Sequence, residues 1–148
     1  MLIAKDAPER IAVTLERVKE HLRIDHDADD KLLESHLKAG IKQIEALTGW
    51  SLSTTEYEWT IEEGDLRKSI PLYPAKITSG HEMVGGYVNA NIGDTVEFKT
   101  SISHHREELE PAVLLYVQFL YEAMPDDQEK LMRAIRGICG TFRRNLGL

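Results

Sequence analysis

Residues 21–34, with the sequence HLRIDHDADDKLLE, contain four aspartates and two histidines. Such a cluster suggests either a metal site or a polar connection between two helices. A calcium-binding EF-hand loop needs a glycine at its sixth position and a glutamate at its twelfth. With Asp25 as the first position, these two places hold Asp30 and His36. The stretch therefore fails the calcium pattern at both discriminating positions.

The histidines of this region do not form a recognisable transition-metal motif. A site would need His21, His26 and His36, but the first two are five positions apart. Two imidazoles share one face of a helix when they are four positions apart. We therefore expect a solvated interhelix loop with no metal and no cofactor, in which Asp27 or Asp29 caps the following helix.

Amphipathic helices are predicted on both sides of this loop. Residues 13–24 have apolar residues at helical spacing, and Thr14 is of a type that often caps a helix N-terminus. Residues 29–48 keep a 3.6-residue apolar period, and Gly49 follows where glycine commonly ends a helix. The two segments predict a helical hairpin over residues 13–49.

The middle of the chain, residues 53–103, is predicted to be a small β insert. In residues 53–61 the apolar side chains of Tyr57, Trp59 and Ile61 alternate with polar ones, which is typical of a half-buried strand. Further strands are predicted at 69–74, which ends at a proline, at 76–78, and in two segments of 86–100 separated by a Gly93-Asp94 turn.

Residues 110–123 predict a third helix that begins at Pro111, with Glu110 near its positive end. This helix is apolar on nearly every side, and a helix of that kind is buried on every side. In a small protein this indicates either a central core helix or a subunit interface. The candidate core or interface residues are Leu114, Leu115, Val117, Phe119 and Tyr121.

Residues 126–148 predict a basic C-terminal helix and tail, capped by Asp126 or Asp127. If this helix continues through Gly137 and Gly140, four arginines share the face opposite an apolar stripe. These arginines are Arg133, Arg136, Arg143 and Arg144. This face could be solvated, or it could dock to an acidic partner or to DNA phosphates. The sequence leaves these interpretations open.

Charge is unevenly distributed along the chain. The net charge is −7, but residues 129–148 hold five basic residues against one acidic residue, so the first 128 residues carry −11. An acidic body with a basic tail favours charge-complementary assembly or a limited polyanion contact. It does not favour a general nucleic-acid binder, which would be basic overall.

The remaining patterns give no sign of an enzyme, a membrane protein or a secreted protein. There is no Gly-x-Ser-x-Gly, phosphate-binding Gly-rich loop or His-Glu-x-x-His motif. His104 and His105 are expected to be loop residues, and Cys139, the single cysteine, to be a core thiol. The longest apolar run, residues 112–117, is far short of the roughly 20 residues of a membrane helix, and the N-terminus does not read as a signal peptide.

The order of the segments carries more information than any single motif. A Leu-x-x-Val-Lys-x-x-Leu-Arg-Ile-Asp helix is followed by an Asp-rich turn, a Leu-Leu helix start, a helix that ends in Thr-Gly, a β region and a Pro-initiated apolar helix that ends in Tyr-Glu. The residues of these motifs are Leu15, Val18, Lys19, Leu22, Arg23, Ile24, Asp25, Asp29, Asp30, Leu32, Leu33, Thr48, Gly49, Pro111, Tyr121 and Glu122. Over residues 13–123 this ordered set resembles the small phage head–tail connector proteins, also called head-completion or adaptor proteins.

The resemblance implies a structural virion protein that is not an enzyme. Such proteins form a ring, usually of twelve copies, that binds the portal protein, meets the next connector, stopper or tail protein, and continues the channel for packaged double-stranded DNA. It also implies a place at the head–tail interface, reached from the host cytoplasm, with no membrane association. The arginines and the apolar helix would then contact the portal, DNA phosphates or a neighbouring subunit.

The expected fold is mainly α with a small β insert, in one connector domain over residues 1–148. An alternative function is a small DNA-binding or regulatory module that uses the basic C-terminal helix. A third, weaker alternative is a metal-dependent enzyme that uses the Asp/His cluster.

Overall fold

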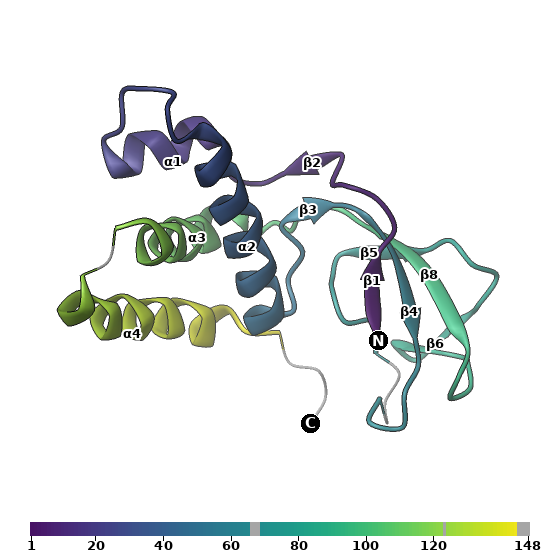
Figure 1. Ribbon diagram of the computed structural model, residues 1–148. Helices are drawn as coiled ribbons and strands as arrows, with labels where there is room; N and C mark the ends of the chain where they lie inside the picture. Colours follow the sequence, from purple (N-terminus) through teal and green to yellow (C-terminus); the bar gives the residue numbers. More distant parts are fainter. Residues whose placement is uncertain (66–68, 123, 145–148) are drawn as a thin grey trace.

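Four helices and three small antiparallel sheets make up the described part of the structure, a computed structural model that describes residues 1–65, 69–122 and 124–144. The helices form one half of the molecule and the strands the other (Figure 1). Each half has its own cluster of buried apolar side chains. The fold is therefore mixed α/β, and its β part is larger than the predicted small insert.

The predicted helical hairpin is confirmed by α1 (Leu15–Leu22) and α2 (Asp30–Thr48). Thr14 caps α1, because its hydroxyl oxygen accepts a hydrogen bond from the backbone N–H three residues on, at 3.2 Å. Gly49 ends α2 with a φ of +76°, a left-handed conformation that glycine adopts without a steric penalty.

The largest sheet has the strand order β1-β4-β8-β5, and all of its pairs are antiparallel. Its central strands are β4 (Glu56–Thr60) and β8 (Thr95–Thr100), and its edges are β1 (Leu2–Ala4) and β5 (Ala75–Ile77). The two smaller sheets pair β2 (Arg10–Ile11) with β3 (Ser53–Thr54), and β6 (Met83–Val84) with β7 (Tyr87–Val88).

The alternating pattern predicted for β4 is confirmed. Tyr57, Trp59 and Ile61 are all buried on the inner face of the sheet. In the β4–β8 ladder Tyr57 lies opposite Phe98 and Trp59 lies opposite Val96, so two layers of large side chains meet across the strands. The rings of Tyr57 and Phe98 stack with their centres 5.4 Å apart.

The prediction of a strand at residues 69–74 is wrong. This segment forms no ladder and contributes one isolated bridge between Trp50 and Tyr73. Its two prolines lack the backbone donor that a ladder needs, and its apolar residues Ile70 and Leu72 instead cover the core of the sheet. The strand predicted at 76–78 is confirmed by β5, and those within 86–100 by β7 and β8, which pair with other strands and not with each other.

The third helix, α3 (Arg106–Tyr121), begins earlier than predicted, and Pro111 lies inside it. Glu107 and Glu108 in its first turn favour this earlier start, since acidic side chains stabilise the positive end of a helix. The hydrogen bond that Pro111 cannot donate would reach a carbonyl of the first turn. Proline therefore removes one intrahelical hydrogen bond near the start of α3.

The last helix, α4 (Pro125–Phe142), also differs from the prediction at both ends. Its N-cap is Met124, with no side-chain capping bond, so the predicted caps Asp126 and Asp127 are wrong. These aspartates lie in the first turn and directly follow Pro125, which occupies the first helical position, where proline is favoured. The helix ends at Phe142, and the last four residues of the predicted tail lie outside the described residues.

Helix α2 packs against the other three helices, and Gly40 lies where α2 meets α3. A Cβ at Gly40 would lie 3.5 Å from the carbonyl oxygen of Val113 and from the side chain of Val117, both on α3. None of the described helices combines the length and the apolar character that a membrane crossing requires.

Candidate assembly surfaces

The polar loop between α1 and α2 is held by ion pairs. Lys19 Nζ donates to Asp27 Oδ1 at 2.7 Å and to Asp30 Oδ1 at 2.9 Å. These hydrogen bonds, together with the charges, raise the pKa of Lys19 and lower the pKa of Asp27. Among the described residues, no three His, Cys, Asp or Glu side chains are grouped so that they could hold a metal ion.

The same loop is tied to the end of α3. Tyr121 Oη donates to Asp29 Oδ2 at 2.6 Å, and His21 Nε2 lies 2.9 Å from Gln118 Oε1. Asp29 occupies the N-cap position of α2, but neither it nor Asp27 makes a capping bond, so the predicted capping chemistry is wrong. The carboxylates pair with α1 and α3 instead, and the bond to Asp29 raises the pKa of Tyr121.

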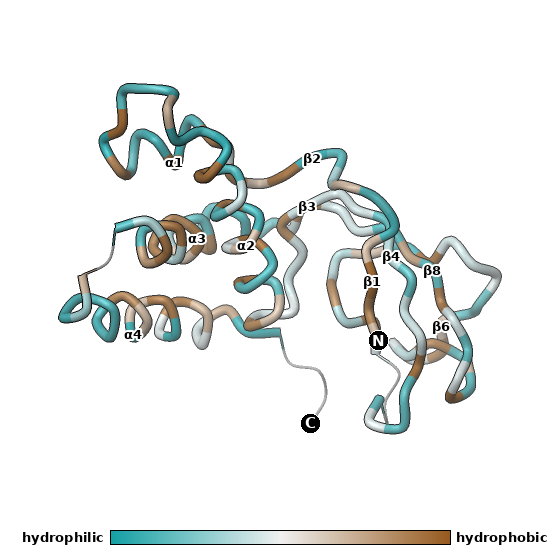
Figure 2. The backbone as a smooth tube through the Cα atoms, in the orientation of Figure 1, coloured by the Kyte–Doolittle hydropathy of each residue, from teal (hydrophilic) through white to brown (hydrophobic). Residues whose placement is uncertain are grey.

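The apolar helix α3 is buried on one side only. Its hydrophobic character extends along most of its length (Figure 2). Leu114 and Val117 belong to the helical core, whereas Leu115, Phe119 and Tyr121 are partly exposed. Leu120 is 36% exposed, and Met124, just beyond the helix, is 66% exposed. The prediction of burial on every side is therefore wrong for the isolated chain, and an apolar strip of α3 remains available to a partner.

The predicted face of four arginines does not form. Helix α4 continues through Gly137 and Gly140 as expected, but it ends before the last two arginines. Arg133, Arg136 and Arg143 are exposed, and Arg133 pairs with Glu129 on the same helix at 3.2 Å. The fourth, Arg144, turns toward the protein.

Arg144 folds back onto the segment that follows α2. Its Nη1 donates to the carbonyl oxygen of Gly49 at 3.0 Å. Its Nη2 donates to the carbonyl oxygen of Ile70 at 2.7 Å and to Ser69 Oγ at 3.3 Å. The guanidinium carbon lies 5.4 Å from the centre of the Tyr73 ring, and burial lowers the pKa of Arg144. The side chain is therefore positioned by neutral groups.

An aromatic cluster surrounds Trp50 next to this arginine. His104 and His105 lie in the turn before α3, as predicted, but their rings also pack against Trp50, with centres 5.5 and 4.7 Å away. The Trp50 Nε1–H donates to the carbonyl oxygen of Phe142 at 2.6 Å. No sequence pattern connects these positions, because they are far apart along the chain.

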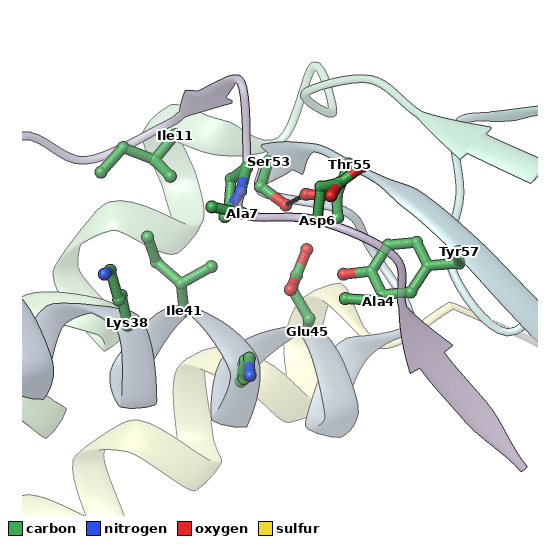
Figure 3. Close-up of a pocket in the computed structure, with 12 residues that line it drawn as sticks. Ala4, Asp6, Ala7, Ile11, Lys38, Ile41, Glu45, Ser53, Thr55 and Tyr57 are labelled. Carbon is green, nitrogen blue, oxygen red and sulfur yellow. Dashed lines mark hydrogen bonds between the residues drawn. The ribbon is translucent and has the colours of Figure 1, made fainter.

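A cavity of about 200 Å³ lies between α2 and the N-terminal segment (Figure 3). Ile41 and Tyr57 form part of its wall, and Glu45, only 3% exposed, points into it. Glu45 Oε2 accepts hydrogen bonds from Leu52 N at 2.9 Å and from Ser51 Oγ at 3.4 Å. Burial raises the pKa of Glu45 from 4.5 to about 7, although these hydrogen bonds oppose the change.

Buried polar groups concentrate around Glu45, at the junction between the helical and β halves. Thr100 Oγ1 donates to the carbonyl oxygen of Ser53 at 2.8 Å, and Ser103 N donates to the carbonyl oxygen of Ser51 at 2.8 Å. The buried polar residues of the described chain are Glu45, Thr48, Ser51, Ser53, Thr55, Thr100 and Ser103. Because such groups are costly without partners, this network fixes how the two halves meet.

The predicted core position of Cys139 is confirmed. Its side chain is buried in the helical core, and burial raises the pKa of its thiol. A thiol in this environment is a poor nucleophile at neutral pH.

The described surface features are the partly exposed apolar side of α3, the exposed arginines Arg133, Arg136 and Arg143, and the cavity beside Glu45. Residues 12–106 match the family described as phage gp6-like head-tail connector protein. This match covers more than half of the sequence, and the chain belongs to that family.

Solved structures with the same fold come from gene transfer agent (GTA) particles. A chain from the neck of an empty GTA particle computed with C6 symmetry is 20% identical, with a TM-score of 0.63. Chains from the virion of a native GTA particle and from a native neck computed with C12 symmetry are 21% and 22% identical, with TM-scores of 0.60 and 0.56. Each comparison covers 100% of this chain and 98% of the other. No curated protein matches the sequence.

Proposed function

We propose that this protein is a structural subunit of a head–tail connector ring, which binds the portal vertex and continues the DNA channel toward the tail. Twelve copies would form the ring, and the next connector, stopper or tail protein would bind its far side. The observation that carries this proposal is the family match over residues 12–106. The likeness in fold to chains of particle necks computed with C6 and C12 symmetry supports it.

Ring formation also agrees with the distribution of surface features. In a ring, one surface of each subunit meets a different surface of the next, and the rotation closes. The outward side of α3, where Leu120 is exposed and Phe119 is partly exposed, offers an apolar surface for such a contact. The polar network around Glu45 supports one connector domain that acts as a unit, since it joins the helical and β halves through buried hydrogen bonds.

The exposed arginines on α4 and directly after its end are the proposed contacts to the portal or to DNA phosphates. Arg136 and Arg143 are the strongest candidates, because Arg133 already pairs with Glu129. The alternative of a small DNA-binding module has less support, since the four-arginine face that it requires is not formed.

Charge reversal tests this assignment. We expect the double variant Arg136→Glu/Arg143→Glu to fold as the parent does and to be lost from assembled particles. A matched control is Arg10→Glu/Lys31→Glu, which changes the net charge equally at exposed positions on β2 and α2. Circular dichroism and thermal unfolding report folding, and quantitative mass spectrometry of purified particles reports incorporation. Normal incorporation of the Arg136→Glu/Arg143→Glu variant would assign these two arginines to solvent.

A further inference from the structure

A second pocket, of about 370 Å³, lies beside the β6–β7 hairpin. Trp50 and Tyr73 provide aromatic walls, Met83 comes from the hairpin, and Arg144 lies at the polar side. The pocket therefore combines one cation with aromatic and thioether surface. This combination is typical of the central residues of protein interfaces, where aromatic residues, methionine and arginine are enriched.

The charge of Arg144 has no acidic partner within the described part of the chain. A guanidinium has five N–H donors, and here three hydrogen bonds go to two backbone carbonyls and a hydroxyl. Among the described residues, no carboxylate contributes to the pKa of Arg144, which burial lowers. A half-buried cation held only by neutral groups gains strongly from a carboxylate, because charge-assisted hydrogen bonds to arginine are short and strong.

The rim of the pocket is apolar and exposed. Tyr73 is 47% exposed and Met83 45%. On the same hairpin, Val84 is 61% exposed and its cross-strand partner Tyr87 is 38% exposed. Grouped exposure of large apolar side chains marks an interaction surface in a soluble protein. A DNA phosphate would use the charge of Arg144 and leave this rim uncovered, so a protein segment fits better.

We propose that this pocket receives a carboxylate-bearing segment from the acidic body of the next copy of the chain. The proposal rests on the ring described above. The first 128 residues carry a net charge of −11, so a neighbouring copy presents acidic side chains in abundance to a basic pocket. A heterologous ring contact requires two different surfaces of the same chain to fit each other, and a basic pocket with an acidic body satisfies this requirement.

Site-specific photo-cross-linking in assembled particles tests the proposal. A benzophenone amino acid placed at Val84, on the exposed hairpin, is expected to join two copies of the chain through a peptide from residues 1–128 that contains Asp or Glu. The same amino acid at Ile92, which is 63% exposed and outside the pocket lining, is the control and is expected to give little of this product. Mass spectrometry identifies the joined peptides.

A second variant tests the role of the charge. Met83→Asp places a carboxylate of the same chain at the pocket rim, where it competes with the incoming segment for Arg144. We expect it to lower the yield of the cross-link from position 84 by about tenfold, whereas Ile92→Asp leaves that yield unchanged. An unchanged yield with Met83→Asp would overturn the role of the charge.

The failure of this inference can be separated from a failure of the proposed function. Particle images show whether the ring exists, and cross-linking shows what contacts the pocket. If the ring is present but position 84 cross-links to a different protein, to a site within its own copy, or to nothing, the pocket proposal alone is refuted. Particles without a ring of this chain would refute the proposed function.

Discussion

Replacing Glu45 by glutamine is expected to remove a large part of the pH dependence of the stability of this protein. The carboxyl group is 3% exposed at the junction of the two halves. Burial raises its pKa to about 7, whereas the usual value is 4.5. The positive charge of Lys42 and two hydrogen bonds act in the opposite direction without cancelling the effect of burial.

The sign of the effect follows from proton linkage. The folded chain binds this proton more tightly than the unfolded chain, so the contribution to the free energy of unfolding is complete below about pH 4.5. It is lost progressively as the pH rises toward about 7. A difference of about 2.5 in pKa corresponds to about 3 kcal/mol. This is a large part of the roughly 5–15 kcal/mol that stabilises a domain.

Urea unfolding between pH 4.5 and pH 8 measures this contribution. Glutamine keeps the oxygen that accepts from Leu52 N and Ser51 Oγ but does not ionise in this range. The free energy of unfolding of Glu45→Gln should therefore fall less than that of the parent over this range, by about 3 kcal/mol. Glu34→Gln, at an exposed position on the same helix, is the matched control and should follow the parent. Parallel curves for the parent and Glu45→Gln would refute the reasoning.

Three further predictions concern the helices. Gly40→Ala should be neutral or stabilising by about 0.5–1 kcal/mol, because the added Cβ would meet α3 at ordinary contact distances. Gly40→Leu should destabilise the protein by about 1–3 kcal/mol through overpacking. Urea unfolding of the two variants compares these effects. Gly49→Ala should destabilise the protein by about 1–2 kcal/mol, because φ is +76° and the added Cβ would lie 3.3 Å from Arg144 Cβ. Gly137→Ala, in open space on α4, should instead stabilise it by about 0.5–1 kcal/mol. Equal effects of the two variants in thermal melts would contradict this prediction. Tyr121→Phe should lower the urea midpoint by removing the hydrogen bond to the loop before α2, and Tyr116→Phe, the control on the same helix, should change it less.

The parts of the fold that were predictable are those fixed by local sequence. The α1–α2 hairpin follows from an apolar period, the capping residue Thr14 and the helix-ending Gly49, all within one stretch of chain. The buried face of β4 follows from its alternation. In contrast, proline is common at the first position of a helix, but Pro111 lies inside α3 because the acidic residues before it also suit a helix start.

The candidate sites were less predictable, because long-range contacts create them. The helical wheel places Arg144 with the other arginines, and only the fold brings Gly49 and Ile70 to it. Glu45 did leave a signal in the sequence, since it lies four residues after Ile41 and three before Thr48, on the buried face of α2. A charged residue at core spacing is a sign of a buried polar network, and this one marks the junction of the two halves.

Cryo-electron microscopy of purified particles, with this chain located by a C-terminal tag, tests the central claim most directly. The proposed function predicts a closed ring of twelve copies between the portal and the tail, with the DNA channel passing through it and the helical and β halves joined as they are here. Particles in which the chain is absent from the head–tail interface, or present there without forming a ring, would contradict it.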